Sequence, residues 1–176
     1  MSAANFSAAL ALELSYEGGF SDNPADPGGA TNLGVTLRVL SAYRGRECTV
    51  ADVRALTRAD VTPLYKRDYW DLVAGDLLAA GVDLIVFDGA VNQGPGTISR
   101  MLQGAAGVAV DGQIGEATLK ACTDTPAALL IERVRLRRLA AYQAAGGWPS
   151  FGVGWARRLN GIAATATSWA SRQAAA

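Results

Sequence analysis

The hydrophobic positions of the chain recur mostly at helical spacing. Phe6, Leu10 and Leu14 share one helical face and predict a first helix over about residues 3–16. Gly18-Gly19 should end it, because glycine adopts the left-handed conformation that closes a helix C-terminus. The same spacing predicts further helices over about residues 36–44, 50–56, 58–70, 82–93, 96–104, 113–122, 126–146 and 152–172.

Three threonines are predicted to cap helices. Thr49 and Thr57 precede two of the helical patterns, and Thr125 precedes Pro126, a residue favoured at the first helical position. The segment 82–93 also fits a buried strand, but the helical patterns on both sides favour a helix.

The segment from Phe20 to Thr36 interrupts the helical pattern. It is dense in glycine, proline, asparagine and aspartate, so turns dominate and only a small hairpin near Thr31–Thr36 is expected. The sequence therefore predicts a mainly α fold with one small β-hairpin after the first helix. An ordered, turn-rich excursion directly after a helix indicates a functional segment.

The composition excludes several kinds of catalytic site. The chain has 176 residues, which fits one domain or one domain with a small appendage. It contains no histidine, so a Ser-His-Asp triad, a Cys-His pair and an H-E-x-x-H metal site are excluded. Proton transfer must then fall to carboxylates, tyrosine, lysine or cysteine.

Cysteine spacing and the N-terminal segment predict a protein that is soluble as made and that has no export signal. Cys48 and Cys122 are isolated, which favours two buried thiols, with a single disulfide as the alternative. The N-terminal segment lacks a basic region, so no signal peptide is predicted, and no apolar run is long enough to cross a bilayer.

Glu17 stands at the end of the first predicted helix. A carboxylate there faces the negative end of the helix macrodipole, which disfavours ionisation and suits a general acid; an exposed glutamate before a glycine cap is the alternative. Asp22, Asp26, Thr31 and Thr36 follow closely. Glycosidic hydrolysis needs one protonated carboxyl and a second group opposite it, although Asx-turns before proline also explain these aspartates.

Several motifs together resemble the glycoside hydrolase 108 family of N-acetylmuramidases. They are EGGFSDNPADPGGATNLGVT (17–36), YKRDYWD (65–71), VFDGAVNQGPG (86–96), LQGAAGVAVDGQIGEAT (102–118) and GWARR (154–158). The resemblance covers nearly the whole chain. It implies a lysozyme-like, mostly helical muramidase that cuts the β-1,4 bond between N-acetylmuramic acid and N-acetylglucosamine, with Glu17 as the catalytic acid.

A more distant similarity to phage-type lysozymes implies assisting residues. These enzymes carry an aspartate nine positions after the glutamate and a threonine about six further on, in a short hairpin. Asp26 has the first spacing, whereas Thr31 falls one position early and Thr36 four positions late. We therefore assign Asp26 and Thr31 as assisting catalytic residues, and Thr36 as the competing choice or a substrate-binding group.

The middle of the chain offers residues that could line a sugar-binding cleft. Tyr69 and Trp70 could stack on sugar faces, and Asn92 and Gln93 could bind acetamido or hydroxyl groups. The alternatives are a core position for the aromatic residues and a helix cap for the amides. Asp71 and Asp88 are further candidates for the second carboxylate.

The second half of the chain resembles a peptidoglycan-binding module. Leu102-Gln103, Asp111-Gly112, Ile114-Gly115 and Thr118 follow a pattern recurrent in such modules, although the same residues could be scaffold. We predict a catalytic region at 1–93 and a helical, peptidoglycan-binding region at 94–176, packed as one compact unit.

Charge is unevenly distributed between the two halves. Residues 1–92 hold 7 basic and 12 acidic residues, and residues 93–176 hold 9 and 4, so −5 is balanced by +5. Four of the basic residues crowd one predicted helix: Arg133, Arg135, Arg137 and Arg138. Either they form a solvated helix face or they attract an anionic cell-wall polymer; few aromatic residues are interleaved, which disfavours nucleic acid.

The preferred hypothesis is a muramidase of the endolysin type that uses Glu17 and no metal or organic cofactor. A lytic transglycosylase using the same glutamate, or a non-enzymatic peptidoglycan-binding or secretion-assisting protein, remains open. We expect a monomer whose partner is peptidoglycan, with no nucleic acid and no membrane insertion. The resemblance suggests synthesis in the cytoplasm and release through a holin-type pore to the periplasm or cell wall.

Overall fold

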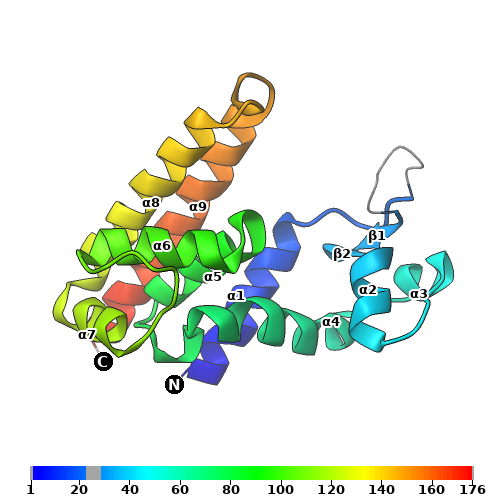
Figure 1. Ribbon diagram of the computed structural model, residues 1–176, viewed down its shortest axis with the longest axis horizontal. Helices are drawn as coiled ribbons and strands as arrows, with labels where there is room; N and C mark the ends of the chain where they lie inside the picture. The colour runs from blue at the N-terminus through cyan, green and yellow to red at the C-terminus, as the bar shows by residue number, and fades with distance from the viewer. Residues whose placement is uncertain (1, 23–28, 176) are drawn as a thin grey trace. The chain divides into compact units, whose positions relative to one another are not determined.

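The computed structural model describes residues 2–22 and 29–175, most of which are helical (Figure 1). The prediction of a mainly α fold with one small hairpin is confirmed. The chain divides into two compact units: residues 1–9 with 69–176, which we call the helical unit, and Leu10–Asp68, the hairpin unit. The predicted boundary after Gln93 does not separate these units, because the helices on either side of it pack together.

The helical unit is built around one buried helix, α5 (Val82–Gln93). Its residues from Val82 to Ala90 are all buried, and α6, α8 and α9 pack against it. Burial on every side explains why this segment has no amphipathic pattern and also fitted a strand. The other elements of the unit are η2 (Asp71–Val73), η3 (Gly75–Leu77), α6 (Pro95–Ala106), α7 (Glu116–Asp124), α8 (Ala127–Ala144) and α9 (Trp148–Ala174).

An aromatic cluster joins the beginning of α1 (Ser2–Tyr16) to the helical unit. The Phe6 ring centroid lies 5.2 Å from that of Trp70 and 5.9 Å from that of Phe87, and the latter two are 5.4 Å apart. Their tilted and edge-on arrangements are favourable for aromatic rings. Trp70 is fully buried, and its indole N–H donates to the Asp76 carboxylate at 2.8 Å.

A buried ion pair fixes α8 and α9 against α5. The Asp88 carboxylate accepts hydrogen bonds from Arg138 of α8 at 2.6 Å and from Arg158 of α9 at 2.9 Å and 3.1 Å. The side chains of Asp88 and Arg138 are fully buried. Because a buried charge without its partner is strongly destabilising, these contacts constrain how the three helices align.

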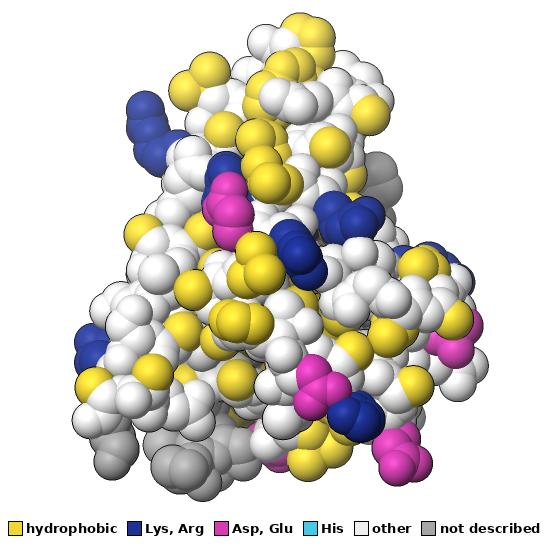
Figure 2. Space-filling view, turned by 90° about the vertical axis from the view of Figure 1, so that its left-hand side faces the viewer, with side chains coloured by type: hydrophobic (Ala, Val, Ile, Leu, Met, Phe, Trp, Pro, Cys, Tyr) yellow, Lys and Arg dark blue, Asp and Glu magenta, His cyan; other side chains and the backbone are white. Residues whose placement is uncertain are grey.

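Other arginines of α8 support the end of a neighbouring helix. Arg133 donates to the Ala105 carbonyl at 3.1 Å, and Arg137 donates to the Gly104 carbonyl at 2.6 Å. Both therefore satisfy backbone groups in the last turn of α6, where cations are favourable. Figure 2 shows the Lys and Arg side chains of one face scattered among hydrophobic, uncharged and acidic groups. Helix packing thus accounts for much of the crowding of arginines in the sequence.

The hairpin unit contains one antiparallel β-hairpin. Thr31 pairs with Thr36, and Asn32 with Val35. Ser21 and Thr31 exchange two backbone hydrogen bonds of 2.8 Å, which hold together the two ends of the segment 22–30. The elements of the unit after α1 are β1 (Thr31–Asn32), β2 (Val35–Thr36), α2 (Leu37–Arg44), α3 (Val50–Arg54), α4 (Arg58–Tyr65) and the first residues of the π-helix η1 (Lys66–Trp70).

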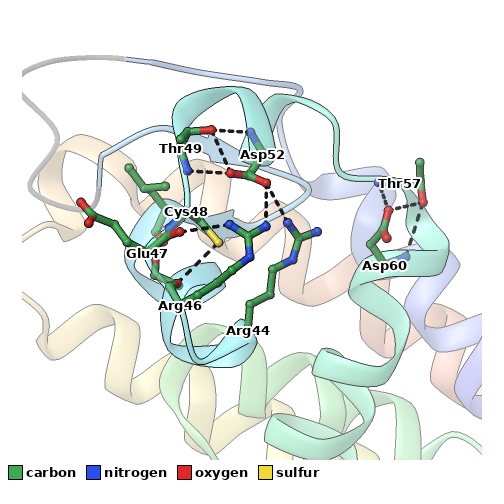
Figure 3. A network of polar contacts seen from close by, with 10 residues as sticks. Arg44, Arg46, Glu47, Cys48, Thr49, Asp52, Thr57 and Asp60 are labelled. Atoms are coloured by element: carbon green, nitrogen blue, oxygen red, sulfur yellow. Dashed lines mark hydrogen bonds and ion pairs between the residues drawn. The ribbon is translucent and has the colours of Figure 1, made fainter.

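Thr49 and Thr57 cap α3 and α4, as the sequence predicts, and each belongs to a capping box. The Thr49 hydroxyl accepts from the Asp52 N–H at 3.2 Å, and the Asp52 carboxylate accepts from the Thr49 N–H at 2.8 Å (Figure 3). Thr57 and Asp60 repeat this arrangement at 3.4 Å and 2.8 Å. Each box satisfies backbone donors that have no partner within the helix.

Two arginines extend the first capping box. Arg46 and Arg44 donate to the Asp52 carboxylate at 3.0 Å and 3.1 Å. The hydrogen bond from Arg46, followed by those from Thr49, lowers the pKa of Asp52 well below its usual range. Hydrogen bonds from Thr57 lower the pKa of Asp60 in the same direction.

One predicted helix cap is wrong. The Thr125 hydroxyl does not cap α8; it donates to the Ala121 carbonyl at 2.8 Å, one turn back in α7. The N-cap position of α8 is occupied by Pro126, and the helix begins at Ala127. Thr125 therefore helps to end one helix rather than to begin the next.

The prediction of two buried thiols is confirmed. Cys48 and Cys122 are both free and buried. Burial raises the pKa of the Cys122 thiol to about 11, so this group is protonated at neutral pH and is a poor nucleophile. Among the described helices, none has both the length and the apolar character needed to cross a membrane.

Replacing Asp88 by alanine should destabilise the protein strongly. The change leaves the Arg138 guanidinium buried without its carboxylate, which costs about 3–5 kcal/mol of unfolding free energy. Urea denaturation followed by circular dichroism measures this loss. The control is Asp124→Ala, which removes an exposed partner of Lys120 and should change stability little. Equal effects of the two substitutions would contradict the role given to the buried pair.

Replacing Asp52 by asparagine should destabilise the protein in a pH-dependent manner. Because the folded-state pKa of Asp52 is lowered, its charge contributes stability above the unfolded value of about 4, and this contribution is lost as the pH falls further. The melting temperatures of the wild type and of Asp52→Asn should therefore approach each other as the pH is lowered from 7 to 2. Glu47→Gln, outside both capping boxes, controls for removal of a carboxylate. A difference that stays constant over this pH range would refute the assignment.

Candidate active site

Glu17 lies directly after the last residue of α1, as the sequence predicts, and is half-buried. Its carboxylate faces the turn of the β-hairpin. A Cβ atom built on Gly34 would lie 3.2 Å from both Cδ and Oε2 of Glu17. The carboxyl group and the turn backbone are therefore in close contact.

The hairpin turn consists of Leu33 and Gly34, both in the left-handed backbone region. Their φ angles are +50° and +71°, which is the two-residue pattern that matches the twist of a hairpin. Glycine adopts this conformation freely, whereas Leu33 does so at a steric cost. Strained non-glycine residues of this kind concentrate at functional sites.

Tyr65 of α4 supports the same turn. Its side chain is buried, and its hydroxyl donates to the Leu33 carbonyl at 3.1 Å. A Cβ atom on Gly34 would overlap this hydroxyl. Glycine at position 34 is thus required twice, by the backbone conformation and by the space that Tyr65 and Glu17 occupy. Sequence reasoning gave Tyr65 no role, because its hydrogen-bond partner lies 32 positions away.

The two candidate threonines lie opposite each other on the hairpin. Thr31 and Thr36 are paired residues, so their side chains share one face. The Thr36 hydroxyl accepts a hydrogen bond from the Val39 N–H at 3.3 Å, so Thr36 is the N-cap of α2. The Thr31 hydroxyl donates to the Gly29 carbonyl at 3.2 Å and keeps its oxygen lone pairs for a further donor. Both hydroxyls therefore make local hydrogen bonds to the backbone.

Asn32, the residue after Thr31 on β1, helps to hold the hairpin in place. The Asn32 amide is buried and donates to the carbonyls of Val53 and Arg54 at 3.1 Å and 3.2 Å, which ties β1 to the end of α3. Asp26 lies outside the described residues.

The chain is similar to known proteins in sequence and in structure. The family model described as Glycosyl hydrolase 108 matches residues 10–94, which include Glu17, Gly34 and Tyr65. A solved structure, "Structure of Brucella abortus SagA", is 41% identical, with a TM-score of 0.85, over 96% of this chain and 97% of that chain. The chain belongs to the glycosyl hydrolase 108 family. Eleven chains of solved structures match this glycosyl hydrolase significantly, and no curated protein does.

The predicted substrate-binding residues of this glycosyl hydrolase other than Thr36 lie in the helical unit. Trp70 is not a sugar-stacking residue, because it is fully buried in the aromatic cluster. Tyr69, its neighbour in η1, is partly exposed. Asn92 and Gln93 reach the surface at the end of α5 and border a pocket. Asp88 is bound to two arginines in the core, so it is not available as a second catalytic carboxylate.

The motif that resembles a peptidoglycan-binding module forms an internally bonded loop. The buried Gln103 amide donates to Asp111, to the Gln113 carbonyl and to Thr118, and it accepts from the Gly112 N–H. Its polar groups are thus engaged within the loop that precedes α7. This supports the scaffold interpretation of these residues. Within the described ranges, no group of three or more histidine, cysteine or acidic residues could hold a metal ion.

Replacing Gly34 by alanine should cost more stability than the same change at Gly45. Both glycines have positive φ angles, so each substitution carries a backbone cost of about 1–2 kcal/mol. Gly45 has open space around its Cβ position, whereas Gly34 meets Tyr65 and Glu17. The overlap should add about 1–3 kcal/mol, measured by urea denaturation.

The double variant Gly34→Ala/Tyr65→Phe tests the cause of this excess. Removing the phenolic oxygen should recover part of the added cost, so the two changes should be non-additive. Equal losses for Gly34→Ala and Gly45→Ala, or strict additivity in the double variant, would refute the close packing described here.

Proposed function

We propose that this glycosyl hydrolase is an N-acetylmuramidase of the endolysin type. Its substrate is peptidoglycan, and it cuts the β-1,4 bond between N-acetylmuramic acid and N-acetylglucosamine. The observation that carries this proposal is the placement of Glu17 at the end of α1, against a strained hairpin turn, in a chain of the glycosyl hydrolase 108 family. The proposal places its action in the cell wall.

Glu17 is the proton donor in the proposed reaction. Its carboxyl group gives a proton to the glycosidic oxygen as the bond from that oxygen to the anomeric carbon breaks. The positive charge that develops on the sugar is then quenched by water, whose second proton passes to a carboxylate. The half-buried position of Glu17 and its contact with Gly34 restrict where the carboxyl can point. Such restriction is what a positioned acid requires.

We assign the second catalytic role, opposite Glu17, to residues between the first helix and the hairpin turn. Asp26 would either activate water as a base or stabilise the charged sugar, and Thr31 would orient the water. The hydrogen bond between Tyr65 and the Leu33 carbonyl supports this assignment, because it fixes the hairpin on which Thr31 stands. The Tyr65 side chain itself acts by positioning the turn.

Glu17→Gln should abolish the release of fragments from purified peptidoglycan while leaving the circular dichroism spectrum unchanged. The amide keeps the shape of the side chain but cannot donate the proton, so a loss of at least about 100-fold is expected. Glu47→Gln is the matched control, because this exposed glutamate lies in the same unit but outside the hairpin.

Mass spectrometry of the fragments identifies the bond and the reaction type. Reducing N-acetylmuramic acid ends support the muramidase. Anhydro-muramic ends would instead mean a lytic transglycosylase that uses Glu17 alone, and reducing N-acetylglucosamine ends would mean a different bond. Binding to peptidoglycan without fragments from the wild type would refute the enzymatic proposal in favour of a cell-wall-binding protein.

A further inference from the structure

The loop between α8 and α9 forms an exposed end of the helical unit. The two helices lie side by side and run in opposite directions, and the end that they share projects beyond α5 and α6 (Figure 1). The loop is short, because α8 ends at Ala144 and α9 begins at Trp148. We call residues 139–156, which comprise the loop and the adjoining ends of both helices, the helical tip.

The helical tip has no charged side chain and exposes large apolar ones. None of its 18 residues is Asp, Glu, Lys or Arg. Phe151 and Val153 are 62% and 78% exposed. The Trp155 ring centroid lies 6.0 Å from that of Phe151 and 5.5 Å from that of Tyr142, so these aromatic residues form one group. Figure 2, in which the tip is at the top, shows hydrophobic side chains gathered there, and contiguous apolar surface marks a site of interaction.

Backbone donors at the start of α9 are bonded within the helical tip. The N–H groups of Ser150 and Phe151 both donate to the Gly147 carbonyl, at 3.1 Å and 2.9 Å. The Trp148 N–H donates to the Ala145 carbonyl at 2.9 Å. A segment that leaves water must keep its backbone groups bonded internally, because an apolar medium offers them no partner. These groups of the tip already meet that requirement.

Basic residues border the helical tip on both helices. Residues 133–176 contain seven arginines and no acidic residue. In the described part of the chain, Arg137 donates to a backbone carbonyl rather than to a carboxylate, and Arg157 is exposed. At the helical rise per residue, these two arginines lie about 10–14 Å from the loop ends of α8 and α9. The uncharged tip is therefore followed by a positively charged zone.

This succession of apolar tip and basic zone fits the surface of an anionic lipid bilayer. Apolar side chains of peripheral proteins enter the boundary between headgroups and acyl chains to a depth of about 5–10 Å, where tryptophan and tyrosine are favoured. With the tip at that depth, Arg137 and Arg157 would lie among the negatively charged headgroups, which attract basic residues.

The size and charge of the helical tip disfavour a protein partner. A stable protein interface engages roughly 20–30 residues on each side, whereas ten residues of the tip are exposed. A second copy of the chain would also bring two sets of bordering arginines together, and like charges repel. A fluid bilayer needs neither a large contact nor a complementary shape.

We propose that the helical tip binds the surface of an anionic lipid bilayer. Phe151 and Val153 enter the headgroup boundary, and Arg137 and Arg157 contact the phosphate groups of the lipids. The expectation of no membrane insertion rests on the length of apolar runs, whereas this contact needs only a few apolar side chains and spans nothing. The proposal goes beyond the proposed hydrolysis and does not depend on it.

Sedimentation of the full chain with lipid vesicles tests the proposal. The chain should bind vesicles made of equal parts phosphatidylglycerol and phosphatidylcholine, and bind much less to phosphatidylcholine alone. Phe151→Ser/Val153→Ser should weaken the binding at least about ten-fold, because the apolar contact is lost, and should leave the circular dichroism spectrum unchanged. Leu77→Ser is the matched control, because Leu77 is 67% exposed in the same unit but outside α8 and α9.

Arg157→Gln tests the electrostatic part of the contact. Removing one basic residue near the headgroups should weaken binding to the anionic vesicles about five-fold. Lys120→Gln makes the same change in net charge on α7, away from the tip in the chain, and should bind as the wild type does.

A pair of tryptophan reporters distinguishes insertion from adsorption through charge alone. Brominated acyl chains quench the fluorescence of tryptophans that enter the bilayer. Vesicles that contain such chains should quench Phe151→Trp more strongly than the wild type. Leu77→Trp, which adds a tryptophan at an equally exposed position, should gain no such quenching.

Four results would overturn the proposal. They are equal binding to vesicles without phosphatidylglycerol, binding that neither the tip variant nor Arg157→Gln weakens, no added quenching of Phe151→Trp, and no vesicle binding at all. A dimer in analytical ultracentrifugation that Phe151→Ser/Val153→Ser dissociates would instead assign the tip to a second copy. Glu17→Gln should bind vesicles as the wild type does, so failure of the hydrolysis and failure of this proposal are distinguishable.

Discussion

The ion pair between Asp88 and Arg138 is the constraint on which the helical unit depends. A helix buried on all sides, such as α5, gains its stability from apolar contact, yet apolar contact alone permits many alignments. A buried carboxylate is stable only where its partners reach it, so α8 and α9 must bring Arg138 and Arg158 to one point. The same guanidinium then orients Gln93 and Tyr142 at the surface. The buried charge is therefore linked to surface residues through one side chain.

The hairpin unit obtains its order in a different way. Its β-hairpin has only two residue pairs, too few to be stable alone. It is held by contacts from outside the strands: Asn32 to the end of α3, Tyr65 to the Leu33 carbonyl, and Ser21 to Thr31. The strained conformation of Leu33 persists because these contacts determine it from several sides.

Features that depend on neighbouring residues could be predicted from the sequence, whereas contacts between residues far apart in the sequence could not. The helices, the hairpin and the caps at Thr49 and Thr57 depend on residues within a few positions of each other, so their patterns are visible in the sequence. The position of Glu17 at the end of the first helix could likewise be predicted. Trp70, Tyr65 and the arginines of α8 have partners far away in the chain. Their roles depend on tertiary packing, which single-sequence patterns do not record.

The paired backbone bonds between Ser21 and Thr31 have an evolutionary consequence. They close a loop whose two ends are fixed by the fold, and the entropic cost of closing such a loop grows only with the logarithm of its length. Insertions between these ends need not displace Glu17 or the hairpin. The fold therefore separates Glu17 and the hairpin, whose positions are fixed by backbone contacts, from a segment whose length can change at little cost in chain entropy.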